Sequence, residues 1–107
     1  MAMTEREVTK YFLEKLKEVG AEARKIKYEN RRGCPDWMVV YEVLYLVELK
    51  STKGQLDPFQ KREKERFEKL NVEVLVIRSK KDVDTFIRDI QWTFWIYEDT
   101  RRCLKSG

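Results

Sequence analysis

Apolar side chains near the N-terminus recur every three or four residues, which is the spacing of one face of a helix. They are Val8, Phe12, Leu16 and Val19. Thr4 and Glu7 precede this run with the spacing of a capping box, and Gly20 follows it as a typical helix stop. The pattern therefore predicts a helix over residues 5–19.

Two strand-like runs, Trp37–Tyr41 and Leu44–Leu49, are rich in β-branched and aromatic residues. Only a couple of residues around Glu42 separate them, which predicts an antiparallel hairpin. A weaker run, Ala21–Lys27, predicts a short strand before the hairpin, and residues 28–35 are predicted to form a loop.

The second half of the chain predicts a helix, a strand and a further helix. Asp57 as N-cap and Pro58 at the first helical position begin a helix that is expected to run to about residue 70. Its inward side chains are predicted to be Phe59, Phe67 and Leu70. Residues 73–78 have the composition of a buried strand, and Ser79 is expected to cap a last helix from about residue 80.

This order of elements favours an α/β fold with a mixed β-sheet flanked by α-helices. A chain of 107 residues is long enough for a single domain, spanning residues 1–107, and too short for two. Charged residues make up 39% of the chain and the formal net charge is +4, which mildly favours a polyanionic partner.

The sequence contains no histidine. Serine-type triads, zinc hydrolases with histidine ligands and nucleases with a histidine base are therefore excluded. Two cysteines, Cys34 and Cys103, are too few for a disulfide scaffold, so reduced thiols and a cytoplasmic location are expected. No signal peptide is expected in the charged first ten residues, and no apolar run approaches membrane-spanning length.

Two opposite charges, Glu48 and Lys50, lie at the end of an otherwise apolar strand, on the side that also carries Leu44 and Leu46. In the predicted hairpin the start of one strand lies beside the end of the next, so Asp36 can converge with Glu48. Two carboxylates, completed by water and phosphate oxygens, suit a hard divalent cation such as Mg²⁺. Lys50 would then point at the attacking water or at the phosphate.

Each of these features also has a purely structural interpretation. The segment Gly33–Asp36 can be a turn alone, because glycine, proline and aspartate all favour turns. Glu48 and Lys50 can form an ion pair of little energetic consequence. The combination of an acid after a proline turn with Glu-X-Lys at the end of the paired strand favours a catalytic site.

These residues resemble the motifs of a known family. The motifs are Gly33-Cys34-Pro35-Asp36, Val47-Glu48-Leu49-Lys50 and the downstream Gln60. Over most of its length the chain resembles the VRR-NUC family (virus-type replication-repair nucleases) of the PD-(D/E)XK nuclease superfamily. The resemblance implies a restriction-endonuclease-like fold and a metal-dependent endonuclease that hydrolyses phosphodiester bonds in DNA.

The resemblance also implies a role for each matched residue. Asp36 and Glu48 would bind Mg²⁺ or Mn²⁺, the backbone carbonyl of Leu49 would complete the shell, and Lys50 would assist the water. Gln60 matches the glutamine of the family.

The family also carries a glutamate on its first helix. Glu5 lies with the buried face of that helix, whereas Glu7 points away and already belongs to the capping box, so Glu5 is the choice. For Gln60 a second interpretation stays open, because it has the capping-box spacing from Asp57.

Basic residues flank the proposed site along the sequence. Arg31, Arg32 and Lys53 lie in the two loops nearest the acids and are predicted to contact the phosphates of DNA. In residues 61–69, where acids are interleaved, a solvated charged face is the preferred interpretation. Cys34 is interpreted as a small loop residue rather than a nucleophile.

The leading hypothesis is a deoxyribonuclease dependent on Mg²⁺ or Mn²⁺ that acts on branched DNA in the manner of a Holliday-junction resolvase. Single-domain members of the family are associated with that activity. The alternative is a catalytically inactive nucleic-acid-binding or protein-interaction module on the same fold. A restriction-type endonuclease is a third hypothesis, but the chain is too short for an added sequence-reading domain.

The C-terminal segment predicts a homodimer. One helical stripe there can pack on the sheet, namely Val83, Phe86, Ile87, Ile90, Phe94 and Tyr97. Trp92, Trp95 and Ile96 fall on a different face, and large aromatic residues exposed together usually mark an interface. In the alternative, the helix ends near Ile90 and the tryptophans fold back onto the core.

Overall fold

Within residues 2–106, which the computed structural model describes, helices and strands follow one another in the predicted order. They are α1 (Glu5–Val19), β1 (Glu22–Lys25), β2 (Trp37–Tyr41), β3 (Val43–Leu49), α2 (Pro58–Lys69), β4 (Val74–Ile77) and α3 (Lys80–Ser106). The boundaries depart from the predicted ones by no more than two residues. Local sequence signals therefore determine most of the secondary structure.

Hydrogen bonds at the helix ends show why these elements begin where they do. At α1, Thr4 Oγ1 accepts the backbone N–H of Glu7 at 3.1 Å, and the Glu7 carboxylate accepts the N–H of Thr4 at 3.2 Å. Gly20 ends the helix in the left-handed conformation, with φ of 78°. Asp57 and Gln60 form the same reciprocal pair at the start of α2. Both predicted capping boxes are confirmed.

The strands of residues 2–106 form one mixed sheet in the order β1-β2-β3-β4. β2 pairs antiparallel with β1 and β3, and β3 pairs parallel with β4. A parallel pair needs a crossover connection, and α2 supplies it. The predicted hairpin turns at Glu42, whose φ is +68°. The predicted α/β fold, a mixed sheet flanked by helices, is confirmed.

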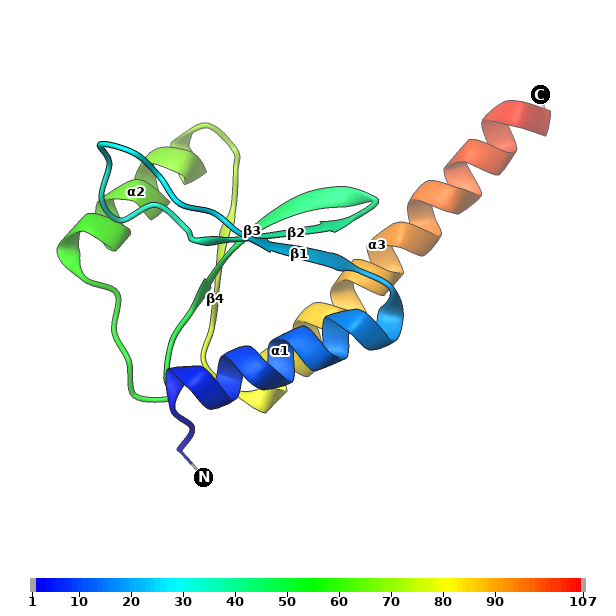
Figure 1. Cartoon of the computed structure of the whole chain (residues 1–107). Coiled ribbons are helices and arrows are strands. Elements are labelled where there is room, and N and C mark those ends of the chain that lie inside the picture. Colours follow the sequence, from blue (N-terminus) through cyan, green and yellow to red (C-terminus); the bar gives the residue numbers. More distant parts are fainter. Residues whose placement is uncertain (1, 107) are drawn as a thin grey trace.

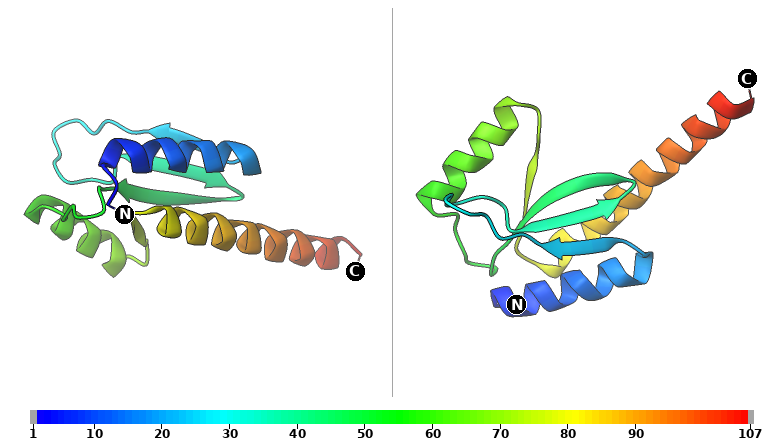
Figure 2. Two further views of the ribbon diagram at one scale, coloured as in Figure 1. Left: turned by 90° about the horizontal axis from the view of Figure 1, so that it is seen from below. Right: turned by 45° about the horizontal axis from the view of Figure 1, so that its top comes forward.

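Helices α1 and α3 lie side by side on one face of the sheet (Figures 1 and 2). One hydrophobic cluster joins these two helices to the sheet, formed by Val8, Phe12, Leu16, Val39, Val47, Leu49, Ile77, Val83, Phe86 and Ile90. Because alternate residues of a strand point to opposite faces, Glu48 lies on the face away from this cluster. The core therefore sets which side of β3 carries the acid.

Helix α2 lies on that other face, where Gln60 contacts Glu48. The prediction that Phe59, Phe67 and Leu70 of α2 point inward is wrong in part, because Phe59 and Leu70 are 41% and 76% exposed. The buried side chain of α2 is instead Glu63, which is 3% exposed. The reason is that α2 packs through polar contacts on the loop between β1 and β2, not through an apolar stripe on the sheet.

Helix α3 continues to Ser106, and its C-terminal half extends away from the sheet (Figure 1). The alternative in which the helix ends near Ile90 is therefore wrong. Trp92 and Trp95 are 62% and 58% exposed, and their rings stack with centroids 5.5 Å apart. Tyr97, predicted to face the sheet, is 47% exposed because it lies beyond the reach of the core.

The tip of the β2–β3 hairpin holds the middle of α3. The Tyr41 ring stacks on Phe94 with centroids 4.9 Å apart, and Arg101 forms an ion pair with Glu42. These contacts fix the direction in which the helix leaves the sheet. Among residues 2–106 no helix, the long α3 included, combines the length and the apolar character that a membrane span requires.

Candidate active site

The centre of the candidate site is a pair of carboxylates on neighbouring strands. Trp37 pairs with Val47 at the end of the β2–β3 ladder, so the next position in this register places Asp36 opposite Glu48. Directly opposite side chains in an antiparallel pair lie on one face, with Cβ atoms about 5 Å apart. The backbone N–H of Ile26 bonds to the carbonyl of Asp36 at 2.8 Å, which keeps Asp36 in the strand direction.

Glu48 is 5% exposed, which is unusual for an acidic residue. Burial and then the neighbouring charge of Asp36 raise the pKa of Glu48 from 4.5 to about 7. Lys50 opposes this shift, whereas Glu5 and Asp57 add to it. The charges of the predicted acids and of Lys50 therefore act on one buried carboxyl group.

Gln60 links α2 to this carboxyl group. Its side-chain nitrogen donates to Glu48 Oε2 at 3.4 Å, and its side-chain oxygen accepts the backbone N–H of Asp57 at 3.0 Å. The two interpretations that the sequence left open are therefore compatible. The capping box holds the amide oxygen, and this directs the amide nitrogen toward Glu48.

Two lysines flank the acids. Lys50 directly follows the last residue of β3, and its backbone N–H continues the ladder to the carbonyl of Ile77 at 3.0 Å. Lys25 of β1 lies with its ammonium 3.6 Å from Asp36 and over the ring of Trp37. Sequence reasoning missed Lys25, because a lysine in a weakly signalled strand carries no motif. Its position follows only from the pairing of β1 with β2.

The two glutamates in the first turn of α1, Glu5 and Glu7, differ in their surroundings. Glu5 is exposed and acts electrostatically on Glu48. Glu7 is engaged with Thr4 in the capping box and lines a hollow with Ser79 at the start of α3. Of the two, Glu5 is the one whose charge raises the pKa of Glu48.

The loop between β1 and β2 is pressed against the first turn of α2 (Figure 2). Gly33 has φ of +84°, and a Cβ there would overlap the Phe59 carbonyl group and lie 2.7 Å from the backbone nitrogen of Gln60. Only glycine permits both the conformation and the approach. The contact explains why the loop that delivers Asp36 carries a glycine at this position.

A buried carboxylate fastens the same loop to α2. Arg31 forms a two-pronged ion pair with Glu63, Arg66 donates to Glu63 at 3.1 Å, and the thiol of Cys34 donates at 3.1 Å. These partners, Arg31 first, hold the pKa of Glu63 at about 2. Burial, chiefly, raises the pKa of Cys34 to about 11, so its thiol stays protonated and a nucleophilic role is not supported.

The donor set fits a divalent cation with an open shell. Among residues 2–106, no group of three or more Asp, Glu or Cys side chains is arranged to hold an ion by itself. Asp36 and Glu48 would supply two carboxylates, leaving room for the Leu49 carbonyl, water and phosphate oxygens. A cation would also offset the burial and like-charge repulsion that raise the pKa of Glu48.

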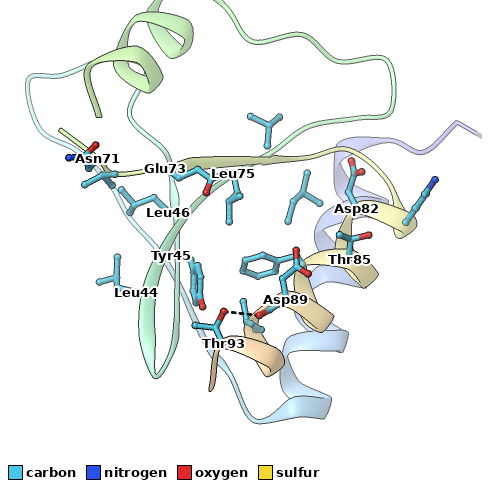
Figure 3. A pocket seen from close by; sticks show the side chains of 16 residues that line it. Leu44, Tyr45, Leu46, Asn71, Glu73, Leu75, Asp82, Thr85, Asp89 and Thr93 are labelled. Carbon is cyan, nitrogen blue, oxygen red and sulfur yellow. Dashed lines mark hydrogen bonds between the residues drawn. The ribbon is translucent and has the colours of Figure 1, made fainter. Parts of the chain in front are cut away.

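A larger hollow of about 650 Å³ lies elsewhere, between the edge strand β4 and α3 (Figure 3). Tyr45, Leu75, Phe86 and Thr93 are among its lining residues. None of the predicted catalytic residues lines it. The predicted catalytic residues therefore lie outside this hollow.

No protein-family model and no curated protein matches the sequence. Among solved structures, one described as "VRR_NUC domain" is 39% identical to this chain and superimposes with a TM-score of 0.71. The match covers 79% of this chain and 96% of the other. This match supports the family resemblance that the motifs at Asp36 and Glu48–Lys50 indicate. This chain therefore belongs to the VRR-NUC family of the PD-(D/E)XK nuclease superfamily and has its nuclease fold.

Proposed function

We propose that this protein is a metal-dependent DNA endonuclease with Asp36, Glu48 and Lys50 at its centre. One observation carries the proposal, namely the register that sets Asp36 opposite a Glu48 that is 5% exposed. Burying one carboxylate beside another is unfavourable unless a proton or a cation offsets the charge. Membership of a nuclease family supports the same reaction class.

Each residue has a distinct role. Asp36, Glu48 and the carbonyl of Leu49 hold Mg²⁺ or Mn²⁺. When bound, the ion supplies Lewis-acid activation of the phosphate. The Lys50 ammonium orients the attacking water and offsets the negative charge that develops on the phosphoryl oxygens. Gln60 keeps the Glu48 carboxylate oriented through the hydrogen bond at 3.4 Å.

Glu5 is the acidic residue that the first helix contributes. It acts on the pKa of Glu48, whereas Glu7 is held by Thr4. Its proposed role is to add negative charge near the cation that Asp36 and Glu48 would hold, because its charge acts on Glu48 from an exposed position.

The substrate we propose is DNA, and branched DNA in particular. Arg31 remains 53% exposed although it pairs with Glu63, and Arg32 and Lys53 are also exposed. These three residues contact phosphates and position the duplex without reading its sequence.

The active form we propose is a homodimer formed through α3. Trp92, Trp95 and Ile96 are exposed on a helix that extends beyond the sheet (Figure 1). The tryptophan rings are already stacked, so little side-chain freedom is lost when a second copy covers them. A two-fold pair of sites could nick the opposing strands of a symmetric junction.

A binding module without catalysis is the second candidate, and one observation favours it. The ammonium of Lys25 lies 3.6 Å from Asp36 and competes with a cation for that carboxylate. Both groups are substantially exposed, so the pair is weak and a divalent ion can displace it.

The deciding experiment is cleavage of end-labelled DNA by the whole chain. The substrates are a four-way junction, a flap, a nicked duplex and a plain duplex, each in Mg²⁺, Mn²⁺, Ca²⁺ or EDTA. We expect cleavage of the branched substrates in Mg²⁺ or Mn²⁺, and binding without cleavage in Ca²⁺. Cleavage in EDTA would exclude the metal mechanism. Binding without cleavage under every condition would favour the inactive module.

A further inference from the structure

A second cluster of charge lies beside the acidic site. Four arginines from two elements line a pocket of about 270 Å³: Arg31 and Arg32 from the loop between β1 and β2, and Arg62 and Arg66 from α2. Asn30, Phe59 and Glu63 complete the lining. The residues that line the pocket therefore carry four guanidinium groups and a single carboxylate.

The charge in this pocket is only partly balanced. Glu63 accepts hydrogen bonds from Arg31 and Arg66, which uses the one carboxylate that lines the pocket. Within residues 2–106, neither Arg32 nor Arg62 forms an ion pair. The pocket thus keeps a positive excess that an anion can neutralise.

Phe59 holds the two unpaired guanidinium groups in place. The central carbons of Arg32 and Arg62 lie 4.7 Å and 5.0 Å from the centre of its ring. Cation–π contacts of this kind orient a guanidinium without consuming its hydrogen-bond donors. The exposure of Phe59, which is unfavourable for packing, is explained by this role. The close approach of Gly33 to α2 holds the loop that carries Arg32 against the helix that carries Arg62.

We propose that this pocket binds a backbone phosphate of the DNA strand close to the scissile bond. The inference rests on the proposed nuclease function and adds a binding subsite to it. Guanidinium groups fit phosphate oxygens with two parallel hydrogen bonds, and Arg32 and Arg62 have their donors free of carboxylates. On α2 the pocket residue Phe59 directly precedes Gln60, which contacts Glu48, so the two sites adjoin. A strand that leaves the acids therefore crosses the start of α2 and enters the pocket.

The test measures DNA binding in Ca²⁺, so that it does not depend on cleavage. The variant is Arg32→Gln with Arg62→Gln, and the matched control is Lys17→Gln with Arg88→Gln, which removes two positive charges from α1 and α3. We expect the pocket variant to weaken junction binding by at least about tenfold near 0.1 M salt, and to reduce the slope of log affinity against log salt by about two. The control should change both by much less.

Phe59→Leu separates positioning from charge. It keeps every arginine, so the salt slope should stay at the wild-type value, while the affinity falls several-fold because the guanidinium groups are no longer held. Circular dichroism checks that each variant is folded.

The outcomes distinguish a failure of the proposed phosphate subsite from a failure of the proposed nuclease function. If wild type cleaves DNA in Mg²⁺ but the pocket variant binds as well as the control, the subsite is wrong and the nuclease function stands. If wild type binds through the pocket but never cleaves, the subsite stands and the nuclease function is wrong. If wild type does not bind DNA, both are wrong.

Discussion

Asp36 lies opposite Glu48, one residue beyond the Trp37–Val47 pair that ends the ladder between β2 and β3. A slip of one residue in this register would turn Glu48 toward the core and Val47 toward the acids. Val47 is fully buried, so the hydrophobic core opposes that slip. The position of two charged groups is therefore maintained by the packing of apolar ones.

Removing any central residue should abolish cleavage. We expect Asp36→Asn, Glu48→Gln and Lys50→Met each to lower the cleavage rate by about 10²-fold or more, because each removes a ligand or a charge that acts on the transition state. Lys17→Gln serves as the control and should cleave at the wild-type rate. If a variant keeps near wild-type turnover, the catalytic assignment of the residue that it replaces is wrong.

The same series distinguishes catalysis from folding. Burial and the charge of Asp36 raise the pKa of Glu48 to about 7, so its charged form destabilises the metal-free protein. Glu48→Gln should therefore unfold at the same or a higher temperature than wild type in EDTA at mildly alkaline pH. A large loss of stability would mean that the lost activity reflects misfolding.

Substitutions of the two glutamates in the first turn of α1 should differ in their effects: one should lower activity and the other stability. Glu5→Gln is expected to slow cleavage several-fold with little change in stability, since Glu5 acts on Glu48 from an exposed position. Glu7→Gln should leave the rate nearly unchanged and cost up to about 1 kcal/mol through the capping box. Cleavage rates and urea unfolding of both variants decide between them, and the reverse order would transfer the role to Glu7.

Gly33→Ala should damage both stability and activity. The added Cβ overlaps the Phe59 carbonyl group at a positive φ, so the loop that carries Asp36 must move away from α2. We expect a loss of about 2 kcal/mol or more and a reduced cleavage rate. Gly20→Ala is the matched control: its φ is +78° but nothing lies within 4 Å, so only the backbone cost of about 1 kcal/mol applies. Equal effects of the two substitutions on cleavage would show that the loop contact does not position the site.

Glu63 should make stability depend on pH in the acid range. Its hydrogen bonds from Arg31 and Cys34 lower its folded pKa from 4.5 to about 2. The unfolded chain then binds the proton more readily, so the stabilisation is present above about pH 4.5 and is lost as the pH falls toward 2. Glu63→Gln should be less stable than wild type by roughly 1.5–3 kcal/mol near neutral pH, with the gap closing in this window.

Urea unfolding across the acid range measures this gap, with the exposed Glu65→Gln of α2 as control. A gap between wild type and Glu63→Gln that does not change with pH would show that ionisation of Glu63 is not the source of its contribution.

The proposed dimer should depend on the tryptophans of α3. Light scattering of wild type is expected to report twice the mass of one chain, and Trp92→Glu with Trp95→Glu should report a monomer, because charges replace the apolar surface. Arg88→Glu, on the same helix, is the control for a change of charge. A monomeric wild type, or a tryptophan variant that stays dimeric, would remove α3 from the interface.

Much of this protein follows from local sequence signals. The capping boxes at Thr4 and Asp57 set the starts of two helices, and the alternation of apolar residues in β3 determines which face carries Glu48. Even the approach of Asp36 to Glu48 could be predicted, because a short hairpin leaves a single register that buries Val47. In each case the interacting groups are close in sequence, so the local pattern of residues is sufficient to predict how they are arranged.

The way in which α2 meets the loop between β1 and β2 depends on long-range contacts and could not be predicted from local sequence patterns. Glu63 lies 32 residues from Arg31, and nothing in its neighbourhood predicts that it is buried while Phe59 is exposed. The arginine pocket and the position of Lys25 beside Asp36 arise in the same way. These contacts join polar side chains from segments far apart in the chain. Such contacts produce no periodic pattern of apolar residues, so the sequence pattern does not predict them. Local sequence patterns are sufficient to predict the helices, the strands and the pairing of Asp36 with Glu48, whereas the crossover through α2 places the polar groups around that pair.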